Sequence, residues 1–212
     1  MNFAANKRFS SDIYLYKMVA DNGGAPCVWR GLLSLALCKP KIRKSAEVGS
    51  LIFGFGGKDY CERLIYIAKV TQKPAVGDYY RLPRFANRPD CIYKNVSGKP
   101  CRKPNARYHA KTDERKKDVG MKFQNAHVLL SRDFRYFGKS GTDDYKKTFP
   151  AIKKLIEHLM QGQRRNYPSR LRSQLLILKN QVWRENRKME IGLPTDSDTS
   201  RLCNWDTASI QC

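Results

Sequence analysis

The sequence has few acidic residues, no long apolar run and no closely paired cysteines. Its 19 Asp and Glu are outnumbered by 41 Lys and Arg, which leaves a formal net charge of +22. An excess of this size predicts attraction to a polyanion, and nucleic acid is the leading partner. No apolar run approaches the roughly 20 residues that a membrane-spanning helix needs, and the N-terminus lacks the apolar core of a secretory signal. We therefore expect a cytoplasmic protein without a membrane partner.

The seven cysteines are scattered along the chain without a C-x-x-C pair. This pattern predicts reduced, mostly buried thiols and no metal site. A zinc site would have to combine Cys91, Cys101, His109 and His127, whose spacing lacks the close ligand pairs typical of structural zinc. The glycines of residues 54–57 fit neither a P-loop nor a dinucleotide fingerprint, so no cofactor is predicted. None of the three histidines comes with a nucleophile that can be recognised from the sequence.

Residues 39–44, Lys-Pro-Lys-Ile-Arg-Lys, place four cations next to a run of apolar residues. Pro40 fixes its own φ and disfavours the α region for Lys39, so we expect an extended basic loop or strand edge here. Residues 48–55 and 63–71 have the composition of two strands, joined by a glycine-rich turn. The pattern predicts a β-hairpin that carries the basic loop at its start.

Further strands are predicted at residues 12–19, 125–131 and 132–138. Residues 32–38 fit either a strand or a short helix. Apolar residues then recur at helical spacing in a helix that starts near Thr148, with Pro150 in its first turn, and in a second helix from about 169 to 188. The apolar stripe of the second helix faces the core, the first helix or a partner chain, which leaves a homodimer through these helices open.

Residues 81–123 form the least regular stretch. Ten basic and three acidic residues lie between positions 94 and 122, and a structureless loop this long is unusual unless it is functional or mobile. The stretch and its approach contain the aromatic residues Tyr80, Phe85, Tyr93 and Tyr108. These rings either stack bases while the cations hold phosphates, or anchor the loop to the core.

Four blocks carry a family resemblance, namely residues 37–54, 63–71, 90–93 and 128–138. In this order they resemble the nucleotide modification associated domain of the second type, a family of bacteria and their viruses that is linked to modified DNA bases. The resemblance covers about residues 12–140. The hairpin alone is also similar to the core of PUA-like domains, small β barrels that include readers of modified bases.

These patterns together predict an α+β protein, with a small, mostly antiparallel, barrel-like (PUA-like) core and a C-terminal helical extension. The expected division is a flexible leader at residues 1–11, a β-rich domain at 12–140, the helical extension at 141–192 and a disordered tail at 193–212.

Two hypotheses about function follow. In the first, a binding protein grips the phosphates of DNA, RNA or a nucleotide, with DNA favoured over RNA, while an aromatic residue receives a base. In the second, an enzyme modifies a nucleotide or a DNA base, with the cations stabilising charge and Asp90 or His109 acting as general acid or base. The residues predicted to bind the nucleotide or its phosphates are Lys39, Lys41, Arg43, Tyr66, Asp90 and Tyr93.

Overall fold

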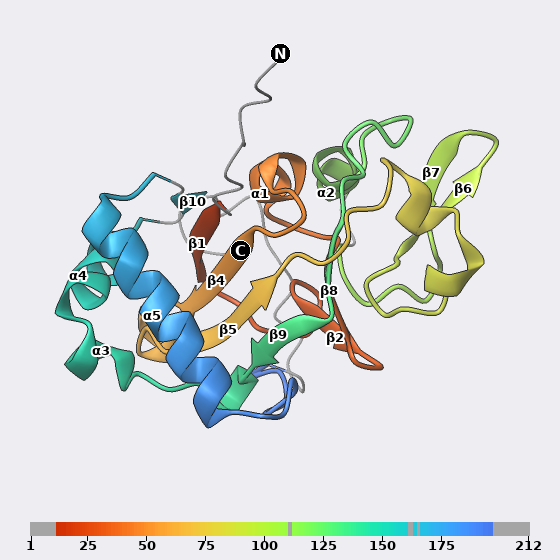
Figure 1. The fold of residues 1–212 in the computed structure, drawn as a ribbon. Helices are drawn as coiled ribbons and strands as arrows, with labels where there is room; N and C mark the ends of the chain where they lie inside the picture. The colour runs from red at the N-terminus through yellow and green to blue at the C-terminus, as the bar shows by residue number, and fades with distance from the viewer. Residues whose placement is uncertain (1–11, 110–111, 161–162, 165, 197–212) are drawn as a thin grey trace, which may run out of the picture.

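The computed structural model describes residues 12–109, 112–160, 163–164 and 166–196. Five strands form the central sheet in the order β10-β1-β4-β5-β9 (Figure 1). Their bounds are Ile13–Met18 (β1), Leu51–Gly56 (β4), Leu64–Lys69 (β5), Asp133–Tyr136 (β9) and Gln163–Arg164 (β10). β1 pairs parallel with β4, and the other neighbours pair antiparallel. The predicted hairpin is confirmed as β4 and β5.

Three helices cover one face of this sheet (Figure 1). They are α3 (Tyr145–Thr148), α4 (Pro150–His158) and α5 (Ser169–Glu185). Both long helices lie where the apolar periodicity placed them, and Pro150 is in the first turn of α4. Phe53 and Ile67 of the sheet share one buried cluster with Ile156 and Leu178 of the helices. The predicted boundary near residue 140 therefore falls within a single core.

The opposite face of the sheet packs against a second sheet and against Ile42 and Ala46. The second sheet has the order β2-β3-β8, with bounds Cys27–Trp29 (β2), Leu32–Leu35 (β3) and Leu129–Ser131 (β8). Residues 32–38, which fitted either strand or helix, thus begin as a strand. Successive residues of β1 alternate between the two cores, with Leu15 on the helical side and Tyr16 on the other. The strand is buried along its whole length because both faces are covered.

The α+β class is confirmed, but the barrel-like core is not. Strands β9 and β10 lie at opposite edges of the five-stranded sheet, and the strands of the described residues form three separate open sheets. Helices and the β2-β3-β8 sheet cover the two faces, so the apolar surface is buried without closure of the sheet.

The sequence predicted an extended basic loop at residues 39–44. The structure instead has a short helix here, α1 (Pro40–Ser45). Pro40 occupies the first helical turn, where its missing N–H removes no helical hydrogen bond. Lys39 satisfies the restriction before proline by adopting a left-handed conformation, with φ of 43°. The prediction treated this restriction as a barrier to a helix, whereas it only fixes where the helix begins.

Residues 81–123 contain more order than the sequence indicated. The hairpin β6 (Tyr93–Val96) and β7 (Lys99–Arg102) precedes the helix α2 (Thr112–Asp118). Short 3-10 turns lie at Asp78–Tyr80 and Pro83–Phe85, and others occur at Lys58–Tyr60 and Gly138–Ser140. Tyr80, Phe85, Tyr93 and Tyr108 are all buried in a third core cluster, which supports the anchoring alternative for these rings.

The predicted tail began at residue 193, but the described residues 193–196 pack against the core. Asp196 Oδ2 accepts the N–H of Asp21 at 2.8 Å and the hydroxyl of Tyr60 at 2.5 Å. The predicted leader and residues 197–212 lie outside the described residues. No helix in the described part of the chain is long and apolar enough to cross a membrane.

Candidate functional site

A thiol, an imidazole and a carboxylate meet in the interior beside α1 and α2. Sγ of Cys38 lies 3.4 Å from Nε2 of His109. The other ring nitrogen of His109, Nδ1, contacts Oδ2 of Asp118. A nucleophile, a base within reach of it, and a third group that orients the base form the arrangement used in nucleophilic catalysis. We call these three residues the triad.

The backbone around the triad is held in sparsely populated conformations. Cys38 has φ of 53°, Lys39 has φ of 43° and His109 has φ of 49°. Positive φ is uncommon for residues other than glycine, and it is found in turns and at functional sites. Cys38 lies between the end of β3 and the start of α1, so its thiol is at the junction between strand and helix.

Asp118, the last residue of α2, connects the parts of the site. Its Oδ1 accepts the backbone N–H of Cys38 at 3.1 Å and lies 3.4 Å from Nη2 of Arg43. Its Oδ2 accepts the hydroxyl of Tyr93 at 3.3 Å in addition to its contact with His109. Asp118 and Arg43 are fully buried. The carboxylate is therefore fixed from several directions and in turn fixes the orientation of the imidazole.

The electrostatic setting favours a protonated imidazole. Burial by itself lowers the pKa of His109, but the adjacent Cys38 and Asp118 outweigh burial and raise that pKa to about 11. A protonated ring donates from Nδ1 to Asp118 and from Nε2 to Cys38 Sγ. Reactive cysteines in proteins are commonly found beside a protonated histidine or another cation.

Two small hollows adjoin Cys38, with free volumes of about 0 and 10 Å³, which is room for one water molecule at most. Both are lined by Cys38 and Ala25. The first hollow also reaches His109 and is completed by Asn22, Gly24, Leu37 and Tyr108. The second is completed by Tyr16, Met18, Val19, Ala20 and Lys39. Cys38 is thus bordered by two narrow spaces and is otherwise enclosed.

The family model described as nucleotide modification associated domain 2 matches residues 10–197 of the chain. The chain belongs to this family. The match confirms the resemblance found in the sequence and extends it beyond residue 140, through the helices that share the core of the sheet. No curated protein and no solved structure matches the chain.

Three of the six residues predicted to bind a nucleotide lie around the triad of this nucleotide modification associated protein. Arg43 and Tyr93 contact Asp118, and Lys39 follows Cys38 directly. Arg43 is turned inward, however, and donates to the carbonyl oxygens of Cys38, Asp118 and His127 at 2.6 to 3.1 Å. It holds α1 and α2 together in the interior, instead of facing outward from a loop as the sequence suggested.

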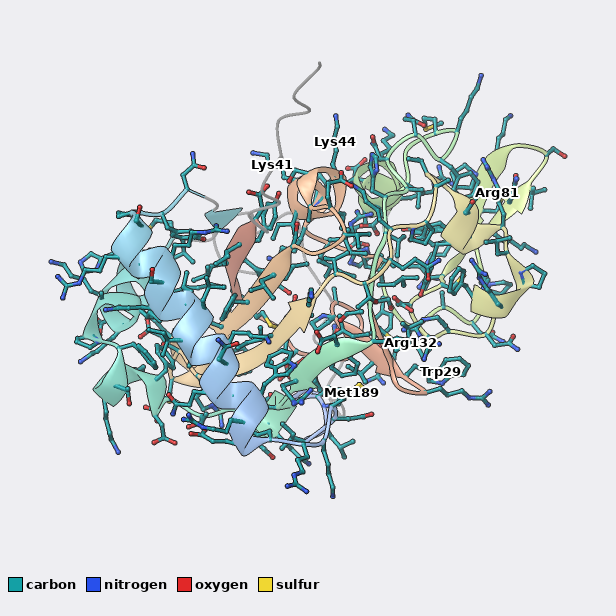
Figure 2. The ribbon with its side chains drawn as sticks, in the orientation of Figure 1. Trp29, Lys41, Lys44, Arg81, Arg132 and Met189 are labelled. Atoms are coloured by element: carbon teal, nitrogen blue, oxygen red, sulfur yellow. The ribbon has the colours of Figure 1, made fainter. Side chains whose placement is uncertain are left out.

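The other three predicted residues lie apart from the triad. Lys41 is exposed on α1 and projects outward with Lys44 (Figure 2). Tyr66 is fully buried, and its hydroxyl lies 2.8 Å from that of Tyr16. The six residues therefore do not converge on one pocket, and their contact with a nucleotide stays a prediction.

Asp90 belongs to a different buried polar cluster. It accepts the hydroxyl of Ser34 at 2.5 Å and that of Tyr79 at 2.6 Å, and it lies 3.4 Å from Nε of Arg88. Arg88 also donates to Ser34 and Tyr79 at 2.6 and 2.9 Å. Every member of this cluster is satisfied by another, so its role is to join β3 to the loop after Pro83–Phe85.

Sequence reasoning named His109 but missed Cys38 and Asp118. In the sequence, 71 residues separate Cys38 from His109 and 80 separate it from Asp118, so no local spacing reveals the triad. The available signal was a cysteine directly before Lys-Pro at the end of an apolar run. Within the described residues, no three His, Cys, Asp or Glu side chains are placed to hold a metal ion, and this includes the zinc set considered above.

Proposed function

We propose that this protein is an enzyme that modifies a nucleotide or a DNA base through a covalent intermediate on Cys38. The observation that carries the proposal is the 3.4 Å approach of Cys38 Sγ to His109 Nε2, with Asp118 on the other ring nitrogen. Family membership supplies the setting of nucleotide modification. The net charge of +22 supports a substrate that carries phosphate.

The triad suits acyl transfer. The Cys38 thiolate attacks the carbonyl carbon of an acyl donor, and a C–S bond forms as the carbonyl π electrons move onto oxygen. The tetrahedral adduct then collapses, the bond to the leaving group breaks, and His109 gives the proton on Nε2 to that group. An amine or hydroxyl of the acceptor next attacks the thioester and passes its proton to His109. The thiolate leaves, and both residues return to their starting states.

In this scheme Asp118 acts by position. It orients His109 through Nδ1 and balances the charge of the imidazolium, which is the role of the carboxylate in related triads. It also anchors the backbone of Cys38, so the nucleophile and the base are held by one group. The site needs no oxidant or reductant for this chemistry.

The test is mass spectrometry of nucleosides after the protein has been incubated with DNA, or with free nucleotides, together with a small-molecule extract of bacterial cells. We expect a new nucleoside with the wild-type protein and with Cys61→Ala, whose altered cysteine is exposed and far from the triad in sequence. The Cys38→Ala variant should produce none. Product formation by Cys38→Ala, or no product from the wild type while it still binds nucleic acid, would overturn the proposal.

A binding protein is the second candidate, and the burial of the triad favours it. Cys38 and His109 are each only 2 % exposed, and the hollows beside them have no room for a substrate. In this alternative the exposed Lys41 and Lys44 hold phosphates, and the triad only ties the chain together. Nucleic-acid binding without any new nucleoside, unaffected by Cys38→Ala, is the result that this candidate predicts.

A further inference from the structure

The tip of the β2–β3 hairpin presents an aromatic ring beside an exposed arginine. Trp29 is the last residue of β2 and pairs with Leu32 at the start of β3. Arg30 and Gly31 form the two-residue turn between them, with φ of 50° and 69°. A two-residue turn with positive φ at both positions favours Asn, Asp or Gly at the first, so an arginine there is unusual. The turn thus holds a charged side chain at the end of the hairpin.

Two guanidinium groups contact the ring of Trp29. That of Arg30 lies 4.4 Å from the ring centre, on an exposed side chain. That of Arg88 lies 5.7 Å from the ring centre, on a buried side chain. Arg88 also donates to the carbonyl oxygens of Trp29 and Leu32 at 3.2 and 3.1 Å. The hairpin tip is therefore fixed from the interior by Arg88, whereas the side chain of Arg30 can move off the ring into solvent.

The second exposed cation near the tip is Arg132. It directly follows Ser131, the last residue of β8, which pairs with Leu33 of β3. Position 132 therefore lies level with the start of β3, where the hairpin turn ends. Figure 2 shows Trp29, Arg132 and Met189 at the same end of the β2-β3-β8 sheet. One ring and two exposed guanidinium groups thus gather at this end of the sheet.

The polar groups of this site have no partner among the described residues. The guanidinium groups of Arg30 and Arg132 have no hydrogen-bond or ion-pair acceptor there. The indole N–H of Trp29 likewise donates to none of the described groups, and it is open to solvent. By contrast, the indole N–H of Trp183 donates to Asp133 at 2.8 Å. Trp29 and its two arginines are therefore available to a ligand.

We propose that Trp29 is a stacking platform for an unpaired base of single-stranded nucleic acid, with Arg30 and Arg132 on the adjoining phosphates. As the strand binds, the base takes the place of Arg30 on the ring, because bases stack well on indoles and an exposed guanidinium binds phosphate well. The net charge of +22 and two arginines without acceptors favour a polyanion as the occupant over a protein surface.

This site is separate from the triad. The strand β3 leads from the hairpin turn towards Cys38, so the two sites lie beyond opposite ends of β3. The inference goes beyond the proposed function and does not depend on a nucleophilic Cys38. It names the form of nucleic acid that the protein holds, namely a single strand or an unpaired base, where the proposed function leaves this form open.

The first test is fluorescence anisotropy with a short labelled oligothymidylate and with the same strand in a duplex. Trp29→Ala should weaken binding of the single strand at least about fivefold. It should change binding of the duplex less than about twofold, because paired bases already stack on one another. Trp29→Phe keeps an aromatic ring and should stay within about threefold of the wild type. Circular dichroism confirms that each variant is folded.

The salt dependence tests the two arginines. Arg30→Gln and Arg132→Gln should each reduce the slope of log affinity against log salt for the single strand by about 0.7. Lys154→Gln removes the same charge from an exposed position on α4 and should have a smaller effect. A reduction by Lys154→Gln as large as that by Arg30→Gln would assign the effect to net charge alone and count against the site.

Tryptophan fluorescence gives an independent measurement. The chain has three tryptophans, so Trp183→Phe combined with Trp205→Phe leaves Trp29 as the only reporter. The single strand should quench most of its emission, because a stacked base quenches an indole. A chain that keeps only Trp183 should be quenched far less, since its ring is packed against the helical core.

Two outcomes would overturn the inference. One is a wild type that binds no single strand. The other is unquenched Trp29 emission together with an affinity that Trp29→Ala leaves within about twofold, which would favour a protein as the partner of the exposed ring. Neither outcome affects the formation of a new nucleoside through Cys38, so failure of this inference is distinguishable from failure of the proposed function.

Discussion

The side chain of Asp118 accepts the backbone N–H of Cys38 at 3.1 Å, although 80 residues separate them in the chain. The same carboxylate contacts Nδ1 of His109 and lies 3.4 Å from the guanidinium of Arg43. One buried group thus joins the end of α2, the start of α1 and the imidazole. The stability of this region and the chemistry of the thiol consequently depend on the same residue.

The first prediction concerns Asp118→Asn, which keeps the shape of the side chain and removes its charge. We expect a loss of about 3–5 kcal/mol in the free energy of unfolding, because the fully buried Arg43 loses its ionic partner. Urea denaturation gives the value. Asp113→Asn on the same helix is the control, because that side chain is 71 % exposed, and it should change stability by less than about 0.5 kcal/mol. Equal stabilities of the two variants would contradict the assignment of Asp118.

The second prediction concerns His109→Gln, which removes the imidazolium beside Cys38. We expect the alkylation of Cys38 by iodoacetamide at pH 7 to slow at least about tenfold, because the sulfur loses the cationic N–H beside it. The rate at Cys61 should not change. His158→Gln serves as the control on the exposed end of α4. A Cys38 rate that is unaffected by His109→Gln would rule out this histidine as the residue that activates Cys38.

The third prediction concerns pH and the buried Asp21. Burial raises the pKa of Asp21, although hydrogen bonds from Tyr136 and Thr195 act in the opposite direction. A raised pKa means that the folded state holds the proton more tightly than the unfolded chain. The resulting stabilisation is complete below the unfolded pKa of about 3.9 and is lost as the pH rises through the folded pKa.

It follows that Asp21→Asn should destabilise the protein more at pH 4 than at pH 7, where the wild type already carries a buried charge. Urea denaturation of both proteins at the two pH values measures this difference. Asp143→Asn, which alters a carboxylate that is 57 % exposed, should show little change between the two. A constant cost of Asp21→Asn across this range would contradict the raised pKa.

The fourth prediction concerns nucleic-acid affinity. Lys41 and Lys44 project from the outer side of α1 (Figure 2), so Lys41→Ala with Lys44→Ala should weaken DNA binding. It should also reduce the slope of log affinity against log salt by about 2. Fluorescence anisotropy at several salt concentrations gives both values. Lys153→Ala with Lys154→Ala on α4 removes the same charge from another face and should have a smaller effect.

Arg43→Ala is not a suitable test of phosphate binding, because Arg43 is fully buried and satisfies three carbonyl oxygens. We expect this change to destabilise the fold. DNA binding that is insensitive to salt, or to the loss of Lys41 and Lys44, would show that α1 does not contact the nucleic acid.

Local patterns in the sequence were sufficient for the elements whose apolar residues repeat regularly. The strands β1 and β4 follow from runs rich in apolar, aromatic and β-branched residues, and β5 follows from an alternation of period two. The helices α4 and α5 follow from apolar residues at a period of 3.6, because one face of each helix has to be buried. The family and its setting also followed from the sequence. The α1 helix did not. The residue before a proline avoids the right-handed helical conformation, and Lys39 does so by adopting a left-handed one, which composition does not reveal.

The sequence by itself thus determined the charge, the main strands and helices, and membership of the family, since each depends on composition or on residues close together in the chain. Only the tertiary structure decided which of seven cysteines and three histidines meet. Cys38, His109 and Asp118 come together because, in the third core cluster, buried side chains such as Tyr93, Val119 and Phe123 pack together with Ala36 and Leu37, which directly follow β3. A contact between groups 71 residues apart depends on the packing of that whole segment, which no local pattern encodes.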